Sequence, residues 1–305
     1  MTPDWPELSD LLLDVDAQTL ERRPVRRAAV LAPLERHGMR EARRIVDGLP
    51  GQDVLDEAAI DAVLLRAHTE LTRLAFEFRN GVRLVQLLRP LLEVLRAVTP
   101  ERPLRVVDIG CGLGFVVRWL AAYGRLGDDV ELLGCDFNPA LIGLAERLSV
   151  EEGLRCRFRV ANAFTLERSA HVFISTGVLH HFRGDALDRF FERQAGAGAR
   201  GVLHCDIKAS WAAPLGAWLF HEARMREPLA KHDGVLSAVR AHPAPTLLDS
   251  ARRTGRPLRF ALFDGAPSPL PLLRTLNTVV GVDAAIEQAF LSALGDGRQR
   301  LGAFT

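Results

Sequence analysis

Apolar and polar positions divide the chain into two regions with different periodicities. In the first region, apolar residues recur at spacings of three and four, which is typical of amphipathic helices. The clearest stretches are 56–79 and 81–98, where aliphatic side chains fill one face. Before them, Pro33 and the turn at 48–51 divide the pattern into shorter helices. The pattern predicts an all-helical segment over residues 1–100.

From residue 101 onward, short apolar runs alternate with helical stretches, the order expected of βαβ units around a parallel sheet. We expect seven strands, at 104–109, 131–135, 155–160, 172–176, 201–206, 257–264 and 275–281. Helices are expected at 114–123, 139–149 and 244–254, with a last one from Asp283. The fold class is therefore α/β, a doubly wound, seven-stranded Rossmann-like sheet over residues 101–305. A helical insertion is expected at 207–242, where it would cover the substrate site.

The first predicted strand ends in a dense glycine pattern. Asp108 closes the apolar run, and Gly110, Gly112 and Gly114 follow at every second position. A strand that leads through a glycine-rich turn into a helix binds anionic groups at the helix N-terminus. The second strand also ends in an acid, Asp136, which is placed to accept hydrogen bonds from ribose hydroxyls. The spacing predicts a site for a nucleoside-like cofactor.

The glycine spacing decides between cofactors. The dinucleotide fingerprint requires a third glycine three positions after the second, where this chain has Phe115. The P-loop pattern also fails, because no Gly-Lys-Ser/Thr follows. The run 108–114 instead resembles motif I of the class I S-adenosylmethionine-dependent methyltransferases, and Asp136 matches the acid of that family after its second strand. A bare tight turn is the alternative interpretation of the glycines.

The resemblance covers residues 101–305, is strongest over 104–182, and implies S-adenosylmethionine as the cofactor. The residues that it assigns to the cofactor follow the first four strands: Asp108, Gly110, Cys111, Gly112, Gly114, Asp136, Phe137, Asn162, Ala163, Phe164, Thr176 and Gly177. Phe137 is expected to lie against the adenine. Asn162 stands where the family commonly has an acid that reads the adenine amino group, and its carbonyl oxygen can accept the same hydrogen bond. Its alternative role is to cap a turn.

Leu179-His180-His181-Phe182 follows the fourth strand and supplies candidate catalytic residues. It resembles the Leu/Cys-His-Asp-Trp stretch of plant phenolic O-methyltransferases, in which the histidine is the base, with His180 at that position. A base is needed when the acceptor is a phenol, because its pKa is about 10. The resemblance breaks down at His181 and Phe182, which replace the Asp and the Trp. His181 is the lesser candidate, and a loop element without proton transfer is the alternative.

His204 and Asp206 alternate along the fifth strand and therefore share a face. Such a pair orients a histidine toward substrate or satisfies a buried histidine, and His204 is the third catalytic candidate. His68 and His242 are expected at the surface. No His, Cys or carboxylate cluster has metal-ligand spacing along the chain, so no metal is expected.

Composition excludes several partners. The formal net charge of the 305 residues is +1, so no global field attracts nucleic acid or a membrane. The four cysteines lie far apart, as expected for reduced thiols in a cytoplasmic protein. No secretory signal opens the sequence and no apolar stretch approaches the length of a membrane span. The N-terminal helices are expected to form a lid or to pair two chains as a homodimer.

The resemblance implies methyl transfer from S-adenosylmethionine to a small-molecule acceptor, at a hydroxyl oxygen, by in-line displacement and in specialised metabolism. One alternative is methylation of RNA or protein. Methylation of base amines in the family uses an Asp/Asn-Pro-Pro-Tyr/Phe stretch after the fourth strand, where this chain has residues 176–179, Thr-Gly-Val-Leu. A homologue that binds the cofactor without transferring methyl is the other alternative.

Overall fold

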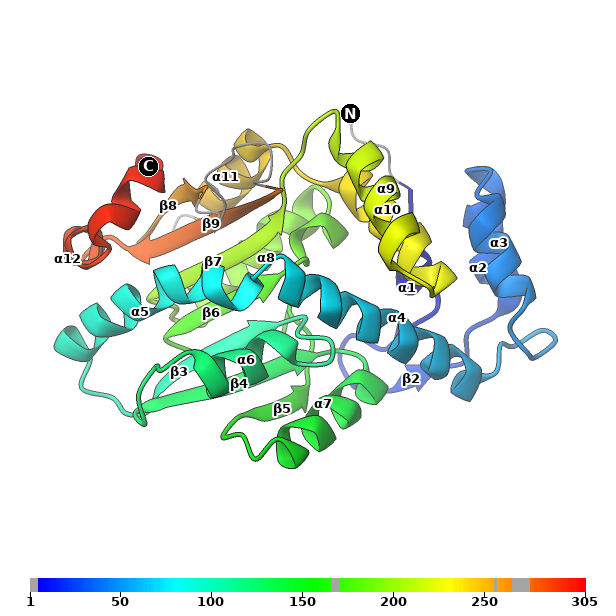
Figure 1. Cartoon of the computed structure of the whole chain (residues 1–305), viewed down its shortest axis with the longest axis horizontal. Coiled ribbons are helices and arrows are strands. Elements are labelled where there is room, and N and C mark those ends of the chain that lie inside the picture. Colours follow the sequence, from blue (N-terminus) through cyan, green and yellow to red (C-terminus); the bar gives the residue numbers. More distant parts are fainter. Residues whose placement is uncertain (1–4, 166–169, 255–256, 265–274) are drawn as a thin grey trace.

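The fold is taken from a computed structural model, which describes residues 5–165, 170–254, 257–264 and 275–305. Its centre is a seven-stranded sheet of β3 (Leu104–Ile109), β4 (Val130–Asp136), β5 (Arg157–Val160), β6 (Val172–Thr176), β7 (Gly201–Ile207), β8 (Leu258–Phe263) and β9 (Leu276–Asp283). The strand order is β5-β4-β3-β6-β7-β9-β8 (Figure 1). β9 runs antiparallel to both of its neighbours, and the other pairs are parallel. The predicted fold class is confirmed.

Both faces of the sheet are covered by helices. Side chains alternate between the faces along each strand, so Val172 and Ile174 pack into one core and Phe173 into the other. The first core is closed by α5 (Asn80–Val98), α6 (Phe115–Tyr123), α7 (Pro139–Glu151) and α12 (Glu287–Ala293). The second is closed by α8 (Asp185–Gly196) and α11 (Ala244–Arg252).

The chain order reverses between β3 and β6, which are neighbours in the sheet. In an open α/β sheet, ligands bind beyond the carboxyl ends of the strands at such a reversal. The glycine pattern follows β3 and the histidine pair follows β6. The topology therefore brings both predicted motifs to one edge.

A third core joins the N-terminal segment to the insertion. The N-terminal elements are α1 (Leu8–Leu11), β1 (Asp14–Val15), β2 (Arg22–Arg23), α2 (Arg27–Arg36), α3 (Arg40–Asp47) and α4 (Glu57–Glu77). The insertion holds α9 (Ala213–Arg224) and α10 (Pro228–Arg240). Leu8 and Ile60 pack into the same cluster as Leu229 and Leu236 of α10. These elements lie together beside the sheet edge that carries the two motifs (Figure 1).

The N-terminal segment contains a short strand pair, so the prediction of an all-helical segment is wrong there. β1 and β2 form a two-residue antiparallel ladder that pairs Asp14 with Arg23. The turn between them is organised by Asp16, whose Oδ1 accepts hydrogen bonds from the backbone N–H groups of Gln18 and Thr19. Among the described residues, no helix has the length and apolar character needed to cross a membrane.

Candidate functional site

The glycine loop between β3 and α6 requires its glycines. Gly110, Gly112 and Gly114 have φ values of +68°, +54° and +68°, which residues with a Cβ adopt only with strain. A Cβ on Gly110 would lie 2.7 Å from Cγ2 of Val178. The loop is fixed to β4, because the backbone N–H groups of Gly110 and Cys111 both donate to the carbonyl of residue 135, at 2.8 and 3.0 Å.

Asp136 ties this loop to the start of α7. Its Oδ2 accepts from the backbone N–H of Gly112 at 2.9 Å, and its Oδ1 accepts from that of Asn138 at 3.0 Å. Each carboxylate oxygen has a second lone pair, so the side chain keeps acceptor capacity for a ligand. The glycine loop and the end of β4 together form a corner. Phe137 follows Asp136 at the rim of this corner, with 44% of its surface exposed.

Asp108 is the buried group of the corner that lacks a partner. Only 1% of its surface is exposed, and neither carboxylate oxygen has a hydrogen-bond partner among the described residues. Burial, assisted by the charge of Asp136, raises the pKa of Asp108 well above its usual value. An unpaired buried carboxyl is costly unless a ligand or an ion completes it. The position therefore fits a ligand that carries an amine.

The remaining cofactor candidates lie around the same edge. Asn162 caps its own turn, because its Oδ1 accepts from the backbone N–H of Phe164 at 2.9 Å. Its Nδ2 also donates to the carbonyl of Ala17 at 3.0 Å, which fastens the N-terminal segment. Contact between Asn162 and an adenine stays a prediction. The half-buried candidates near this edge are Cys111, Ala163, Phe164 and Thr176, whereas Gly177 is exposed.

α4 covers the glycine loop, which the sequence pattern did not indicate. A Cβ on Gly112 would lie 3.0 Å from Cδ2 of His68, so this ring packs directly on the loop. Nδ1 of His68 lies 2.9 Å from the carbonyl of Leu64, and burial lowers the pKa of the ring. His68 is therefore half-buried against the loop rather than fully at the surface, where it was expected. The same expectation is wrong for His242, which is buried with Nε2 2.8 Å from the carbonyl of Phe182.

His180 is oriented by Asp206 across two strands. It lies in the short helix η1 (Leu179–His181) after β6, with 4% of its surface exposed. Asp206 on β7 accepts from the backbone N–H of His180 at 2.9 Å, and its other oxygen lies 2.8 Å from Nδ1 of the ring. Burial alone would raise the pKa of Asp206, but the charge and hydrogen bond of His180 hold that pKa below its usual range. Nε2 of His180 therefore points away from Asp206.

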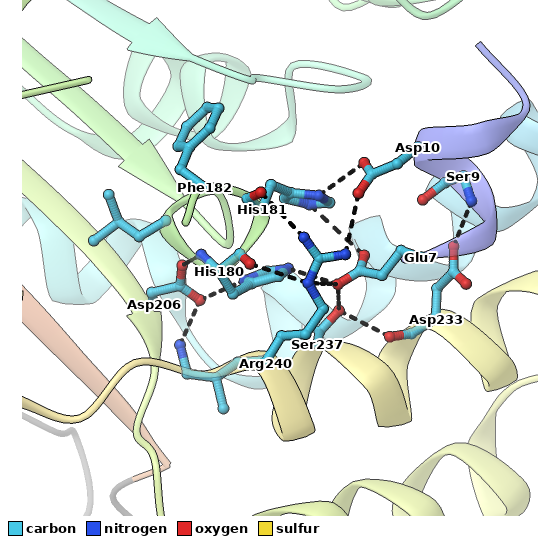
Figure 2. A network of polar contacts seen from close by, with 12 residues as sticks. Glu7, Ser9, Asp10, His180, His181, Phe182, Asp206, Asp233, Ser237 and Arg240 are labelled. Atoms are coloured by element: carbon cyan, nitrogen blue, oxygen red, sulfur yellow. Dashed lines mark hydrogen bonds and ion pairs between the residues drawn. The ribbon is translucent and has the colours of Figure 1, made fainter. Parts of the chain in front are cut away.

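Nε2 of His180 faces a carboxylate from the N-terminal segment. Glu7 is 2% exposed, and its two oxygens lie 3.6 Å from Nε2 of His180 and 3.8 Å from Nε2 of His181 (Figure 2). Nδ1 of His181 lies 2.9 Å from Oδ1 of Asp10. Burial would lower the pKa of His181, but the charges of Glu7 and Asp10 raise it to about 9.

Arg240 of α10 closes this network from the insertion. Its guanidinium donates to the carbonyls of His180 and His181, at 3.2 and 3.0 Å, and to Asp10 at 3.2 Å. Sequence reasoning missed Glu7, Asp10 and Arg240. No motif marks them, because they come from segments far apart along the chain.

His204 has a different role from the one expected. It is 0% exposed, with Nδ1 2.8 Å from Oγ of Ser175 and Nε2 2.6 Å from Oε1 of Gln194. An amide oxygen only accepts, so Nε2 carries the hydrogen and Nδ1 accepts from Ser175. Burial lowers the pKa of the ring to about 3. The assignment of His204 to substrate is corrected: both nitrogens are satisfied inside the core, and Asp206 orients His180 instead.

Glu7, His180 and His181 also form a group with metal-ligand geometry. Their ligand atoms all lie within 4.8 Å of one another, and this is the one such group among the described residues. The expectation of no metal rested on spacing along the chain. That spacing did not reveal Glu7, which joins the two histidines through the packing of α1 on α10.

Comparisons with known proteins match part of the sheet, from β3 to β6, to a family. Residues 106–197 match a family described as a methyltransferase domain. The trans-aconitate 2-methyltransferase of Methylobacterium radiotolerans is 32% identical over 166 residues, which make up 48% of this chain and 61% of that protein. The chain therefore spans less than two thirds of this relative's length.

Solved methyltransferase structures resemble the chain more distantly. Magnesium protoporphyrin IX methyltransferase from Synechocystis PCC 6803 is 17% identical with a TM-score of 0.45, covering 82% of this chain and 95% of that one. The plantazolicin methyltransferase is 13% identical with a TM-score of 0.48, covering 73% and 96%. Scores of this size carry no argument about substrate.

S-adenosylmethionine is the cofactor that the matched domain implies, and the corner described above fits it. Asp108 offers an unpaired buried carboxyl to the cofactor's amine, and Asp136 has lone pairs left for ribose hydroxyls. The glycine loop leaves room for close approach to the backbone, as motif I requires. The matched domain over residues 106–197, this motif and the strand order are similar to those of the class I S-adenosylmethionine-dependent methyltransferases.

Proposed function

We propose that the chain transfers the methyl group of S-adenosylmethionine to the hydroxyl oxygen of a small-molecule acceptor. The observation that carries the proposal is the position of His180, which Asp206 orients at the same sheet edge as the glycine loop. S-adenosylmethionine supplies an electrophilic methyl group on a sulfonium. The chain's own residues hold the two reactants and handle one proton.

On the cofactor side, each chemical group of S-adenosylmethionine is assigned to one part of the chain. Asp108 faces the amine, the N–H groups of the glycine loop and the start of α6 face the carboxylate, and Asp136 takes the ribose hydroxyls. Phe137 lies exposed beside Asp136, where it can pack against the adenine. Positioning of this kind supplies most of the catalysis of an in-line displacement.

On the acceptor side, the hydroxyl must lose its proton as its oxygen attacks. Nε2 of His180 is the ring nitrogen that Asp206 leaves free, so we place the activation of the hydroxyl there. A carboxylate acceptor, such as that implied by the name of the trans-aconitate relative, is already ionised near neutrality and needs no such group. The buried His180–Asp206 pair therefore favours a hydroxyl over a carboxylate.

Two measurements test the proposal. Calorimetry should show S-adenosylmethionine binding to the wild type and much weaker binding to Asp136→Ala. Acceptor panels of phenols, aliphatic alcohols and carboxylic acids should then give S-adenosylhomocysteine only with hydroxyl compounds. Turnover confined to the carboxylic acids would overturn the hydroxyl assignment. If the chain binds the cofactor but no panel gives turnover, the chain is a homologue that binds the cofactor without transferring methyl.

A further inference from the structure

The distances between Glu7 and the two histidines fit a shared metal ion better than hydrogen bonds, while Oε1 of Glu7 also accepts a hydrogen bond from Oγ of Ser237 at 3.2 Å. Its two oxygens lie 3.6 Å from Nε2 of His180 and 3.8 Å from Nε2 of His181. Both separations exceed those of a hydrogen bond. Two ligand atoms that each lie about 2.1 Å from one tetrahedral Zn²⁺ are roughly 3.4 Å apart. The three side chains therefore converge on a point without bonding one another.

Each histidine is also held as a metal ligand would be. Nδ1 of His180 lies 2.8 Å from a carboxylate oxygen of Asp206, and Nδ1 of His181 lies 2.9 Å from one of Asp10. A carboxylate on the second ring nitrogen fixes the tautomer and makes the free nitrogen a better ligand. Two adjacent histidines from one short helix are oriented in this way by acids from different elements, and both present Nε2 to Glu7 (Figure 2).

Carboxylates surround the two histidines. Glu7, Asp10 and Asp206 contact them, and the guanidinium of Arg240 is the permanent positive charge among the residues drawn in Figure 2. Arg240 donates to the carbonyls of His180 and His181 and to Asp10, and its Nε lies 3.8 Å from the Glu7 oxygen that faces His180. Buried carboxylates need a counter-charge, and a divalent cation supplies two.

We propose that Glu7, His180 and His181 bind one divalent transition-metal ion of the zinc type, which activates the acceptor hydroxyl. Two imidazoles and a carboxylate suit this class of metal, and three protein ligands leave a coordination position open for an acceptor oxygen. This inference rests on the proposed function, in which Nε2 of His180 marks the place of activation. It assigns the lowering of the hydroxyl pKa to the ion rather than to a free imidazole.

The proposed step balances without a further reactant. The hydroxyl proton leaves to water, and an electron pair of the oxygen forms the new bond to the methyl carbon. The bond between that carbon and sulfur breaks, and its electron pair stays on sulfur. The ion holds the oxygen and changes neither its own charge nor its oxidation state.

Cobalt(II) is the probe for this site, because its visible absorption reports coordination by nitrogen and oxygen. The full chain is treated with a chelator, dialysed and titrated with Co²⁺. We expect one bound Co²⁺ per chain, visible absorption bands, and displacement by Zn²⁺. Glu7→Gln and His181→Asn should abolish the bands, while His37→Asn, at the exposed C-terminal end of α2, should keep them.

Asp10→Asn guards against a folding artefact, because it alters a group that orients a ligand and not a ligand itself. Its Co²⁺ affinity should fall by about 10- to 100-fold while its circular dichroism stays that of the wild type. Sub-stoichiometric Co²⁺ without bands, or wild-type affinity in Glu7→Gln, would overturn the metal site and leave an ion-pair network. Calorimetry with S-adenosylmethionine is independent of this result. If the chain binds S-adenosylmethionine but not Co²⁺, only the metal site is ruled out. If it binds Co²⁺ but not S-adenosylmethionine, only the proposed function is ruled out.

Discussion

At the scale of single residues, the Asp206 carboxylate contacts Nδ1 of His180 and so leaves Nε2 as the nitrogen that we propose for activation of the acceptor. Asp206→Asn keeps the shape of the side chain but removes its charge, so the ring loses the partner that fixes its tautomer. We expect kcat/KM for methyl transfer to fall by about 10²–10⁴-fold with the Kd for S-adenosylmethionine unchanged. Steady-state kinetics and calorimetry measure the two quantities.

The control for this variant is Asp188→Asn. Asp188 pairs with Arg253 at 2.9 Å on an exposed surface of α8, and its loss should leave kcat/KM unaltered. If Asp206→Asn retained wild-type turnover, His180 would not be the site of activation.

His204 makes a pH-dependent contribution to stability. Its pKa is about 3 in the fold and 6.5 in the unfolded chain, so the unfolded state takes up the proton first on acidification. Its contribution to stability is complete above pH 6.5 and is lost as the pH falls from 6.5 toward 3, by up to about 1.4 kcal/mol per pH unit. His204→Gln should be less stable at pH 7 but lose stability less steeply below pH 6.5.

Urea unfolding of wild type and His204→Gln at several pH values between 7 and 4 measures this difference. Because all other titrating groups are common to both proteins, only the difference in slope is assigned to His204. Parallel curves would show that the ring is not buried in its neutral form.

At the scale of elements, the glycine loop joins β3 to α6 through a backbone that only glycine adopts without strain. Gly110→Ala places a Cβ 2.7 Å from Val178 at a φ of +68°, which costs about 1–2 kcal/mol before any neighbour moves. We expect at least about a tenfold weaker Kd for S-adenosylmethionine. Calorimetry measures this change.

Gly153→Ala is the matched control for backbone strain. Gly153 has a φ of +64° after α7, and no atom lies within 4 Å of the position that a Cβ would take. The variant should therefore lose stability while keeping its Kd. Equal Kd values for the two variants would mean that the loop does not contact the cofactor.

The elements of the sheet were largely predictable from the sequence. Strands buried on both faces are short continuous apolar runs, so β3 and β6 begin and end at the predicted residues. β9 extends two residues beyond its prediction, into Asp283, because its pairing with β8 continues there. The β1–β2 ladder was missed because two residues in each strand are too few for a periodic pattern.

At the scale of the whole molecule, a buried acid of the insertion holds the start of the N-terminal segment, beside the hydrophobic core that the two share. Asp233 of α10 accepts hydrogen bonds from the backbone N–H groups of Leu8 and Ser9, at 2.9 and 2.8 Å, and so caps the start of α1. Asp233→Asn weakens this cap and should raise amide exchange across residues 5–16 while exchange in the sheet strands stays slow.

Exchange measured by mass spectrometry on wild type, Asp233→Asn and Asp249→Asn tests this arrangement. Asp249 is exposed on α11, so its substitution should have no effect. Unchanged protection of residues 5–16 in Asp233→Asn would show that the segment is held without this contact.

This docking explains why half of the candidate site could not be predicted. The glycine motif and His180 belong to local patterns around β3 and β6, which sequence reasoning detects. Glu7 reaches His180 only because Leu8 packs on α10, and no periodicity or spacing encodes a meeting of the N-terminal segment with the insertion. The lid and homodimer roles of the N-terminal helices stay predictions.

Carbon-13 NMR of the product distinguishes methyl transfer to oxygen from transfer to nitrogen or carbon. The wild type is incubated with S-adenosylmethionine labelled at the methyl carbon and with the hydroxyl acceptors that give S-adenosylhomocysteine. We expect a labelled signal at the chemical shift of a methoxy carbon with the wild type, and no such signal with Asp206→Asn. A labelled methyl on nitrogen or carbon, or no labelled product beyond the cofactor, would contradict it.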